Sequence, residues 1–427
     1  MRLFATICLV VPLAVSSVTH ATDQAVAADP QVLRHLKETI RQQQAQLQQQ
    51  AAQLKHQEEL LRQLAEQVSA LTRQSAQSAT ALKAPAAVPV SGGNSNIKLT
   101  LSGQINRAMN VVGDGGGTAI YHVDNNVSNS RIRLVGTAPI DSDLTLATRL
   151  ELAFTADESS KVSQKDQAPG TYLNARWADI SLASKTYGKL SLGKGNTASY
   201  TTAAADFSKT DIVHYSSVAD IAGGLLFRKK DGKLTSTALS DVFTDFDGLN
   251  VKSRLRYDSP KFYGFNMAAS LITDRRSDLG LYWAGQGYGF EAAAGFGLAD
   301  PRLADSGLQY DGSFSLLHSA TGLNLTLSSG ILEKKRDNNA FSYYGKLGWL
   351  ADLTKLGSTA FGVDVSRSEN SSAAGDRGIS VGAAVVQEFK KLSSELYLQY
   401  RIYALKMGDG TPVHDLNVGT LGVRVKF

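Results

Sequence analysis

The sequence predicts an all-β transmembrane barrel of about 16 antiparallel strands, preceded by an N-terminal α-helical coiled coil. Apolar and polar residues alternate with a period of two through most of residues 97–427. Short and long connections alternate between these stretches along the chain. The chain ends on the alternating stretch 417–427, whose exposed edge would invite aggregation unless a closed barrel paired it with the first strand.

Residues 1–21 have the layout of a secretory signal peptide. Arg2 precedes an apolar run over residues 3–15, and small or polar residues follow as far as Ala21. A membrane anchor is the alternative, but the run has about thirteen residues where a helical span needs roughly 20. The only cysteine, Cys8, lies inside this segment, so the mature chain would have no thiol for disulfides, metal binding or catalysis.

Residues 22–72 contain a heptad repeat, which is typical of a coiled coil. The second core set of the repeat has glutamine in three successive layers, which costs stability but can fix register and strand number. A lone amphipathic helix or a low-complexity glutamine tract is the alternative, yet a solitary polar helix would be marginal in water. We therefore expect an oligomer. The first core set is apolar throughout: Leu33, Ile40, Leu47, Leu54, Leu61 and Val68.

Residues 73–96 are rich in Ala, Ser, Gln, Pro and Gly, and we interpret them as a linker. The chain has 44 basic and 39 acidic residues, and this net charge of +5 is too balanced to predict nucleic acid as a partner. Although 43% of the residues are hydrophobic, no stretch after residue 15 is long enough for a helical membrane span. The apolar content is dispersed, as it is in many short strands.

Residues 97–427 form the expected barrel domain. Predicted short turns include 139–142, 259–260, 285–287, 319–322 and 390–393. Predicted long loops include 113–118, 299–306, 333–339, 367–377 and 407–415. One rim of tight turns and one rim of long loops is typical of an outer-membrane barrel. In the last strand, Leu421, Val423 and Val425 are expected to face lipid, and Arg424 the interior.

Residues 195–250 are the longest stretch without sustained alternation, and they are too long for an ordinary connection. We expect this stretch to fold into the barrel as a constriction loop. A strand pair hidden by weak alternation is the alternative.

Several ordered motifs resemble those of Gram-negative general porins of the alphaproteobacterial type. They are Ser102–Ala108, Ser130–Gly136, Arg176–Leu182, Tyr187–Lys194 and Leu255–Phe265, followed by the terminal Phe427. The resemblance implies a homotrimer of sixteen-stranded, water-filled barrels, each with a third extracellular loop that narrows the pore. It also implies that Phe427 is a signal for the barrel assembly machinery. The N-terminal coiled coil resembles the extension of dicarboxylate-type and sucrose-type porins.

Charge placement suggests how such a channel would select solutes, because low-dielectric walls focus the field of charged side chains. We expect a basic wall to face an acidic loop and to favour small anionic solutes such as dicarboxylates. The expected wall comprises Arg131, Arg133, Arg149, Arg176, Lys194, Arg254 and Arg256, of which Arg176 and Lys194 come from the family pattern. The expected acidic residues of the loop are Asp206, Asp211 and Asp220.

Other functions are less well supported by the sequence. A sugar-selective porin would need a helical path of inward aromatic residues, and although Tyr397 has the inward parity, the sequence shows no continuous path. A trimeric adhesin would use only about four strands per chain, which leaves most of residues 97–427 unused. A barrel enzyme would need a catalytic constellation. The histidines are scattered without metal-ligand spacing, so we predict no catalytic residue, no metal and no cofactor.

The predicted location is the outer membrane, with lipid and lipopolysaccharide around the barrel. If the strand count is even and Phe427 lies at the periplasmic rim, the coiled coil extends into the periplasm. There it would clamp the trimer or hold it at a distance from peptidoglycan.

Overall fold

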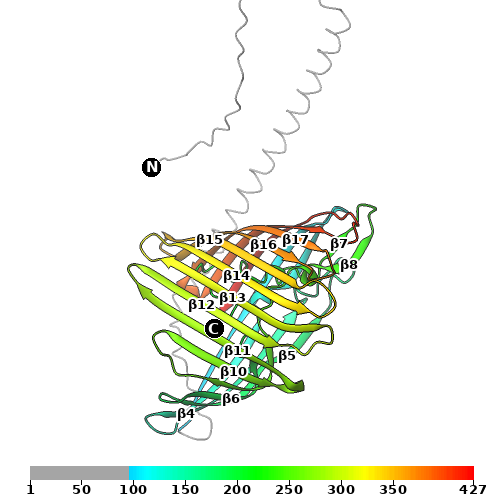
Figure 1. Cartoon of the computed structure of the whole chain (residues 1–427). Coiled ribbons are helices and arrows are strands. Elements are labelled where there is room, and N and C mark those ends of the chain that lie inside the picture. Colours follow the sequence, from blue (N-terminus) through cyan, green and yellow to red (C-terminus); the bar gives the residue numbers. More distant parts are fainter. Residues whose placement is uncertain (1–95) are drawn as a thin grey trace, which may run out of the picture. The chain divides into compact units, whose positions relative to one another are not determined.

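The computed structural model describes residues 96–427. The predicted signal peptide, the coiled coil and most of the linker lie outside the described residues. Figure 1 shows the strands tilted around a closed barrel. Its long strands are β1 (Lys98–Gly113), β4 (Leu144–Ala156), β5 (Thr171–Ser184), β6 (Gly188–Asn196), β9 (Val251–Asp258), β10 (Phe265–Ile272), β11 (Arg276–Gly287), β12 (Phe290–Asp300), β13 (Ser306–His318), β14 (Leu323–Lys334), β15 (Ala340–Thr354), β16 (Gly357–Glu369), β17 (Arg377–Phe389), β18 (Ser394–Lys406) and β19 (Leu416–Lys426).

One further barrel strand is interrupted. The end of β1 pairs with β2 (Thr118–Asp124), and the start of β1 pairs with β3 (Arg131–Pro139). The 3-10 helix η1 (Asn126–Ser128) separates the two segments, so β2 and β3 together count as one strand. The 17-stranded antiparallel sheet is therefore a barrel of 16 strands, which confirms the predicted strand number.

The barrel closes between β1 and β19, which pair from Gln104 with Lys426 to Gly113 with Asn417. Phe427 extends this pairing, because its backbone nitrogen donates to Gly103 O at 3.0 Å and Gly103 N donates to Phe427 O at 2.8 Å. A Cβ atom on Gly103 would lie only 2.5 Å from the ring of Phe427. The terminal aromatic ring thus packs on a glycine at the seam of the barrel.

The variant Phe427→Ala should lower the unfolding temperature of the barrel, because the ring that packs on Gly103 is lost. The free energy of unfolding should fall by about 1 kcal/mol, since the ring is only partly buried. Heat-modifiable mobility on semi-native gels would measure it. Val425→Ala, which shortens a similarly exposed side chain of the same strand, is the control, and equal effects of the two variants would contradict a special role for the terminal ring.

The two rims differ as predicted. On one rim the connections are short, such as 140–143, 185–187 and 319–322. On the other they are mostly longer, and they include 157–170, 197–250 and 407–415, whereas η2 (Thr273–Arg275) makes the shortest one there. The predicted turn at 285–287 is wrong by two residues. Strand β11 continues to Gly287, and the turn falls at Tyr288 and Gly289, both of which have positive φ angles.

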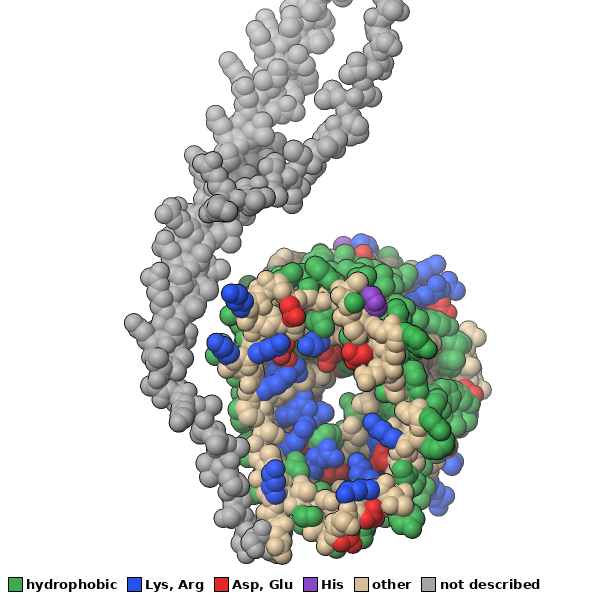
Figure 2. All heavy atoms as spheres, turned by 90° about the vertical axis from the view of Figure 1, so that its left-hand side faces the viewer, with side chains coloured by type: hydrophobic (Ala, Val, Ile, Leu, Met, Phe, Trp, Pro, Cys, Tyr) green, Lys and Arg blue, Asp and Glu red, His purple; other side chains and the backbone are tan. Residues whose placement is uncertain are grey.

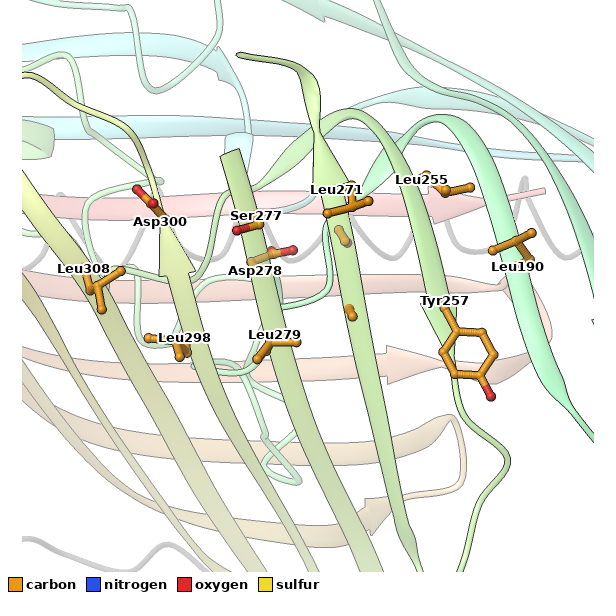
Figure 3. A pocket seen from close by; sticks show the side chains of 12 residues that line it. Leu190, Leu255, Tyr257, Leu271, Ser277, Asp278, Leu279, Leu298, Asp300 and Leu308 are labelled. Carbon is orange, nitrogen blue, oxygen red and sulfur yellow. The ribbon is translucent and has the colours of Figure 1, made fainter. Parts of the chain in front are cut away.

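Apolar side chains cover the outside of the barrel. Leu421, Val423 and Val425 are each more than two-fifths exposed, whereas Thr420, which precedes them, is fully buried. On β6 and β9–β13, leucines line an outer groove of about 510 Å³, and Figure 3 shows them along successive strands. This pattern fits a surface that contacts lipid. The described residues contain no helix that is long and apolar enough to cross a membrane.

The connection 197–250, called the inner loop below, packs inside the barrel. It contains β7 (Leu226–Arg228), β8 (Leu234–Ala238) and the short helix α2 (Leu239–Val242). Its apolar side chains, such as Ile212 and Phe243, form one buried cluster with inward side chains of β1, β2 and β15–β19. The inner loop therefore covers one side of the interior and leaves the side of β3–β6 and β9 for charged residues.

Candidate functional site: the charged interior

Three arginines of the predicted basic wall converge on one carboxylate. Glu151 on β4 is fully buried and accepts hydrogen bonds from Arg133 at 2.6 Å and Arg176 at 2.9 Å. Arg131 lies 3.4 Å from the same carboxylate. The guanidinium side chains of Arg133 and Arg176 keep 36% and 26% exposure. One negative charge thus fixes three positive charges, so this part of the wall stays net positive.

A second carboxylate, Asp179 on β5, binds two more arginines. Arg254 lies 2.8 Å from Asp179 and also donates to the carbonyls of Gly193 and Asn196. Its side chain is only 4% exposed, so it stabilises the wall but is not accessible to solutes. Arg149 lies 3.7 Å from Asp179 and keeps 34% exposure.

A β-bulge in β5 turns two successive side chains toward the interior. Glu151 pairs with Trp177, but the next residue, Leu152, pairs with Ala175, so Arg176 is the extra residue. Arg176 therefore reaches Glu151, while the Trp177 ring contacts the guanidinium groups of Arg149 at 3.8 Å and Arg133 at 4.8 Å from its centroid. Trp177 joins the two arginine clusters through cation–π contacts.

The prediction for Lys194 is wrong. In the register of β5, β6 and β9, it pairs with Ala178 and Ser253, which are exposed on the outer face. Its neighbours Gly193 and Gly195 have the inward parity, because a Cβ atom on either would approach Asp179. Strict alternation therefore removes Lys194 from the wall. Arg256 does face inward, where it is paired with Asp258 at 2.6 Å.

The three predicted acidic residues of the inner loop have different surroundings. Asp206 is almost buried and paired with Lys346 of β15, so its charge is neutralised. Asp211 is exposed, and Asp220 is half-buried and accepts a hydrogen bond from the Tyr215 hydroxyl. Two further carboxylates, Asp245 and Asp247, line the same cavity of about 460 Å³ as Asp211 and Asp220. Among the described residues, none of these last four has a cationic side chain within ion-pair distance.

The hydroxyl of Tyr200 in the inner loop is influenced by both kinds of charge. Burial and the negative charge of Asp247 raise the pKa of its hydroxyl to about 12, while Arg176 of the wall lowers it. Both charges therefore act on one side chain of the interior. Figure 2 shows an opening through the barrel with Lys and Arg side chains gathered along one side.

The inner loop is held on its other side by buried polar contacts. The Lys346 ammonium, which is fully buried, donates to Thr210 Oγ1 at 3.2 Å and His214 O at 2.8 Å in addition to Asp206. The His214 ring is buried 3.2 Å from Asp364, which also binds Arg401 at 2.6 Å. A Cβ atom on Gly382 would come within 2.5 Å of that ring, so the glycine makes room for it.

A closed barrel with apolar side chains outside and a charged, open interior belongs to the class of outer-membrane channels. Residues 70–420 match the family model described as Gram-negative porin. Because this match covers more than half of the chain, the protein belongs to that family. It is an outer-membrane porin, which lets small polar solutes and ions diffuse passively.

Solved structures agree on the fold. The anion-selective porin from Comamonas acidovorans is 14% identical, with a TM-score of 0.53 over 78% of this chain and 100% of that one. OmpT, an outer-membrane protein of Vibrio cholerae, is 13% identical, with a TM-score of 0.52 over 79% and 99%. The channel DcaP of Acinetobacter baumannii is 9% identical, with a TM-score of 0.52 over 80% and 100%. No curated protein sequence matches this chain.

Several residues that shape the interior were not among the predicted site residues. Glu151 has the same parity as Arg149 two residues earlier, so alternation could have found it. Trp177 could not be found in this way, because the bulge breaks the alternation. Asp245 and Asp247 lie in a segment without periodicity, where sequence gives no facing. Residues 96–427 contain no group of three or more potential metal ligands.

Proposed function

We propose that this porin favours small anionic solutes such as dicarboxylates. The observation that carries the proposal is the charge of the wall, where Glu151, Asp179 and Asp258 offset only part of the arginine charge, so that six positive and three negative charges leave +3. The six arginines are Arg131, Arg133, Arg149, Arg176, Arg254 and Arg256. In a narrow passage between low-dielectric walls, this excess raises the local concentration of anions.

The inner loop carries negative charges opposite in sign to those of the basic wall. Its carboxylates Asp211, Asp220, Asp245 and Asp247 line one cavity together with Tyr200, so a dipolar solute would be oriented between them and the basic wall as it passes. Burial raises the pKa of Asp220 to about 6, and it also raises the pKa of Asp247, with help from Asp245. The raised pKa values mean that the acidic side loses negative charge as the pH falls below neutral.

Solute uptake into proteoliposomes tests the proposal. Succinate, butanediol and putrescine have similar lengths but carry negative, zero and positive charge. We expect succinate to enter fastest and putrescine slowest. Faster uptake of putrescine than of succinate would overturn the proposed preference, while uptake of all three would still agree with a porin.

The preference for anions should increase as the pH falls from neutral toward 5. Because the pKa of Asp220 is raised to about 6, its carboxylate is ionised above that pH and gains a proton below it. The loss of a negative charge from the inner loop then favours anions. Reversal potentials measured across this range would show the change. Asp220→Asn should reduce the pH-dependent step, and an unchanged step would contradict the assignment.

A sugar-selective channel is the less favoured alternative. Tyr397, the predicted inward aromatic residue, is fully buried and bonded to Asn106 and Asn125. The ring of Trp177 is in contact with two guanidinium groups. Neither of these aromatic side chains offers a free face for a chain of sugars. We propose that the protein acts as a channel and not as an enzyme, an adhesin or a nucleic-acid-binding protein.

The assembly that we propose is a homotrimer in a membrane of lipid and lipopolysaccharide. One solved relative, OmpT of Vibrio cholerae, is described in a trimer form. We further propose that Phe427 is read by the barrel assembly machinery and that the coiled coil in the periplasm clamps the trimer or contacts peptidoglycan. Deletion of residues 31–72 should lower the melting temperature of the trimer on semi-native gels, and an unchanged temperature would count against the clamp.

A further inference from the structure

A second cavity of about 460 Å³ adjoins the inner loop on the side of the short connections. It shares Tyr200, Thr201 and Ala204 with the acidic cavity, but its other polar lining differs. That lining comes from β6, β9, β10, β11 and the connection 259–264, and it comprises Asn196, Arg256, Lys261, Asn266 and Tyr282. The inner loop thus separates an acidic cavity from one lined by cationic, amide and aromatic side chains.

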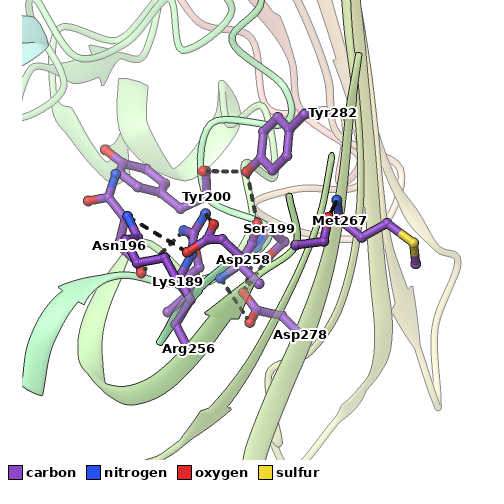
Figure 4. A network of polar contacts seen from close by, with 12 residues as sticks. Lys189, Asn196, Ser199, Tyr200, Arg256, Asp258, Met267, Asp278 and Tyr282 are labelled. Carbon is purple, nitrogen blue, oxygen red and sulfur yellow. Dashed lines mark hydrogen bonds and ion pairs between the residues drawn. The ribbon is translucent and has the colours of Figure 1, made fainter. Parts of the chain in front are cut away.

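The cavity is positively charged. Asp258 is the carboxylate that pairs with Arg256 at 2.6 Å and with Lys189 at 3.8 Å (Figure 4). Within residues 96–427, Lys261 has no ion pair and no hydrogen-bond acceptor, and its side chain is exposed at the cavity. Of the two cationic side chains that line the cavity, Arg256 is paired with Asp258, so the Lys261 charge is free to bind a ligand directly.

Uncharged hydrogen-bonding groups of the cavity also lack partners. In the described part of the chain, neither the amide of Asn266 nor the hydroxyl of Tyr200 makes a side-chain hydrogen bond. Asn196 accepts one from Trp177 at 2.9 Å, which leaves its amide nitrogen available. Groups of this kind suit hydroxyl groups, which both donate and accept hydrogen bonds.

The aromatic side chains are held in place. The Tyr282 hydroxyl donates to the backbone around the loop entry, 2.8 Å from Ala198 O and 3.0 Å from Tyr200 O (Figure 4). Ser199 is fixed in turn by Asp278, which accepts from its backbone nitrogen at 2.9 Å and from its hydroxyl at 2.6 Å. The segment that carries Tyr200 is therefore anchored to β11, and the cavity is largely formed before a ligand enters.

We propose that this cavity binds small hydroxylated anions of the sugar-acid type as they pass through the channel. Lys261 would bind the carboxylate. Asn266, Asn196 and the Tyr200 hydroxyl would bind the hydroxyl groups, and the tyrosine rings would pack against the carbon skeleton. The inference rests on the proposed preference for anions and adds a ligand class to it.

Block of the ion current through single channels in a planar bilayer tests the proposal. Three probes of similar size separate its parts: D-glucuronate has charge and hydroxyl groups, methyl glucoside has only hydroxyl groups, and cyclohexanecarboxylate has only charge. We expect glucuronate to block at a concentration about tenfold lower than either of the others, because both kinds of contact contribute.

Two variants assign the contacts. Lys261→Met should weaken block by glucuronate and cyclohexanecarboxylate about tenfold and leave methyl glucoside unchanged. Asn266→Ala should weaken block by glucuronate and methyl glucoside and leave cyclohexanecarboxylate unchanged. Lys390→Met removes an exposed charge of the same rim outside the cavity and serves as the control. Semi-native gels would verify that each variant is folded.

Equal block by glucuronate and cyclohexanecarboxylate in the unaltered protein would overturn the inference, as would equal effects of Lys261→Met and Lys390→Met. The reversal potential of the same channels reports the proposed anion preference separately. Anion preference without glucuronate block would refute only the site, whereas cation preference would refute the proposed function.

Discussion

Replacement of Glu151 by glutamine is expected to increase the anion preference of the channel and to destabilise the barrel. The carboxylate is fully buried and contacts Arg131, Arg133 and Arg176. Without it, three guanidinium groups would surround a neutral amide. A single charge acting over about 4 Å in water contributes about 1 kcal/mol, so the ratio of anion to cation permeability should rise by about two- to fivefold.

The stability of the Glu151→Gln variant should fall by about 3 kcal/mol, because one partner of a buried ion cluster is lost. Thermal unfolding in detergent would measure this fall, and reversal potentials would measure the selectivity. Glu369→Gln, which breaks an exposed ion pair with Arg367, is the matched control and should change stability by about 1 kcal/mol or less. If both variants behave alike, Glu151 does not organise the wall.

Replacement of Lys346 by methionine should release part of the inner loop into the passage. The ammonium group is fully buried and holds Asp206, Thr210 and His214 at the inner face of β15. Without it, the Asp206 carboxylate would be left buried and unpaired, at a cost of about 3–5 kcal/mol. The loop segment can move only away from β15 and into the passage, so we expect a lower and fluctuating single-channel conductance.

The matched control for this variant is Lys355→Met, which removes an exposed lysine between β15 and β16. Its conductance should equal that of the unaltered channel. A steady, unchanged conductance of the Lys346→Met channel would contradict the view that this lysine tethers the loop. The contacts of Thr202 with Asp311 and of Ser199 with Asp278 should keep the beginning of the loop in place in both variants.

The barrel could be predicted from sequence because each strand repeats one simple rule. In β19, for example, Leu421 and Val423 are exposed and Thr420 is buried, as strict alternation requires. The same rule predicts Arg131, Arg133 and Arg149 on the inside. It would also have excluded Lys194, whose assignment came from a family pattern and not from its parity.

The interior was harder to predict because its arrangement depends on exceptions to alternation and on long-range contacts. The bulge at Arg176 brings Trp177 to the wall, and no local sequence pattern marks it. The inner loop has no period, so the pairing of Asp206 with Lys346, which are 140 residues apart, could not be seen. Whether a given carboxylate is free or neutralised therefore depended on the three-dimensional structure.

We expect the basic wall, and not the acidic loop, to set the ion preference of the channel. The reversal potential of single channels under a potassium chloride gradient tests it most directly. We predict chloride preference in the unaltered channel and a marked loss of that preference in the double variant Arg133→Gln, Arg149→Gln, which neutralises the two most exposed arginines of the wall. Potassium preference in the unaltered channel, unchanged in the double variant, would show that the basic wall does not set the ion preference.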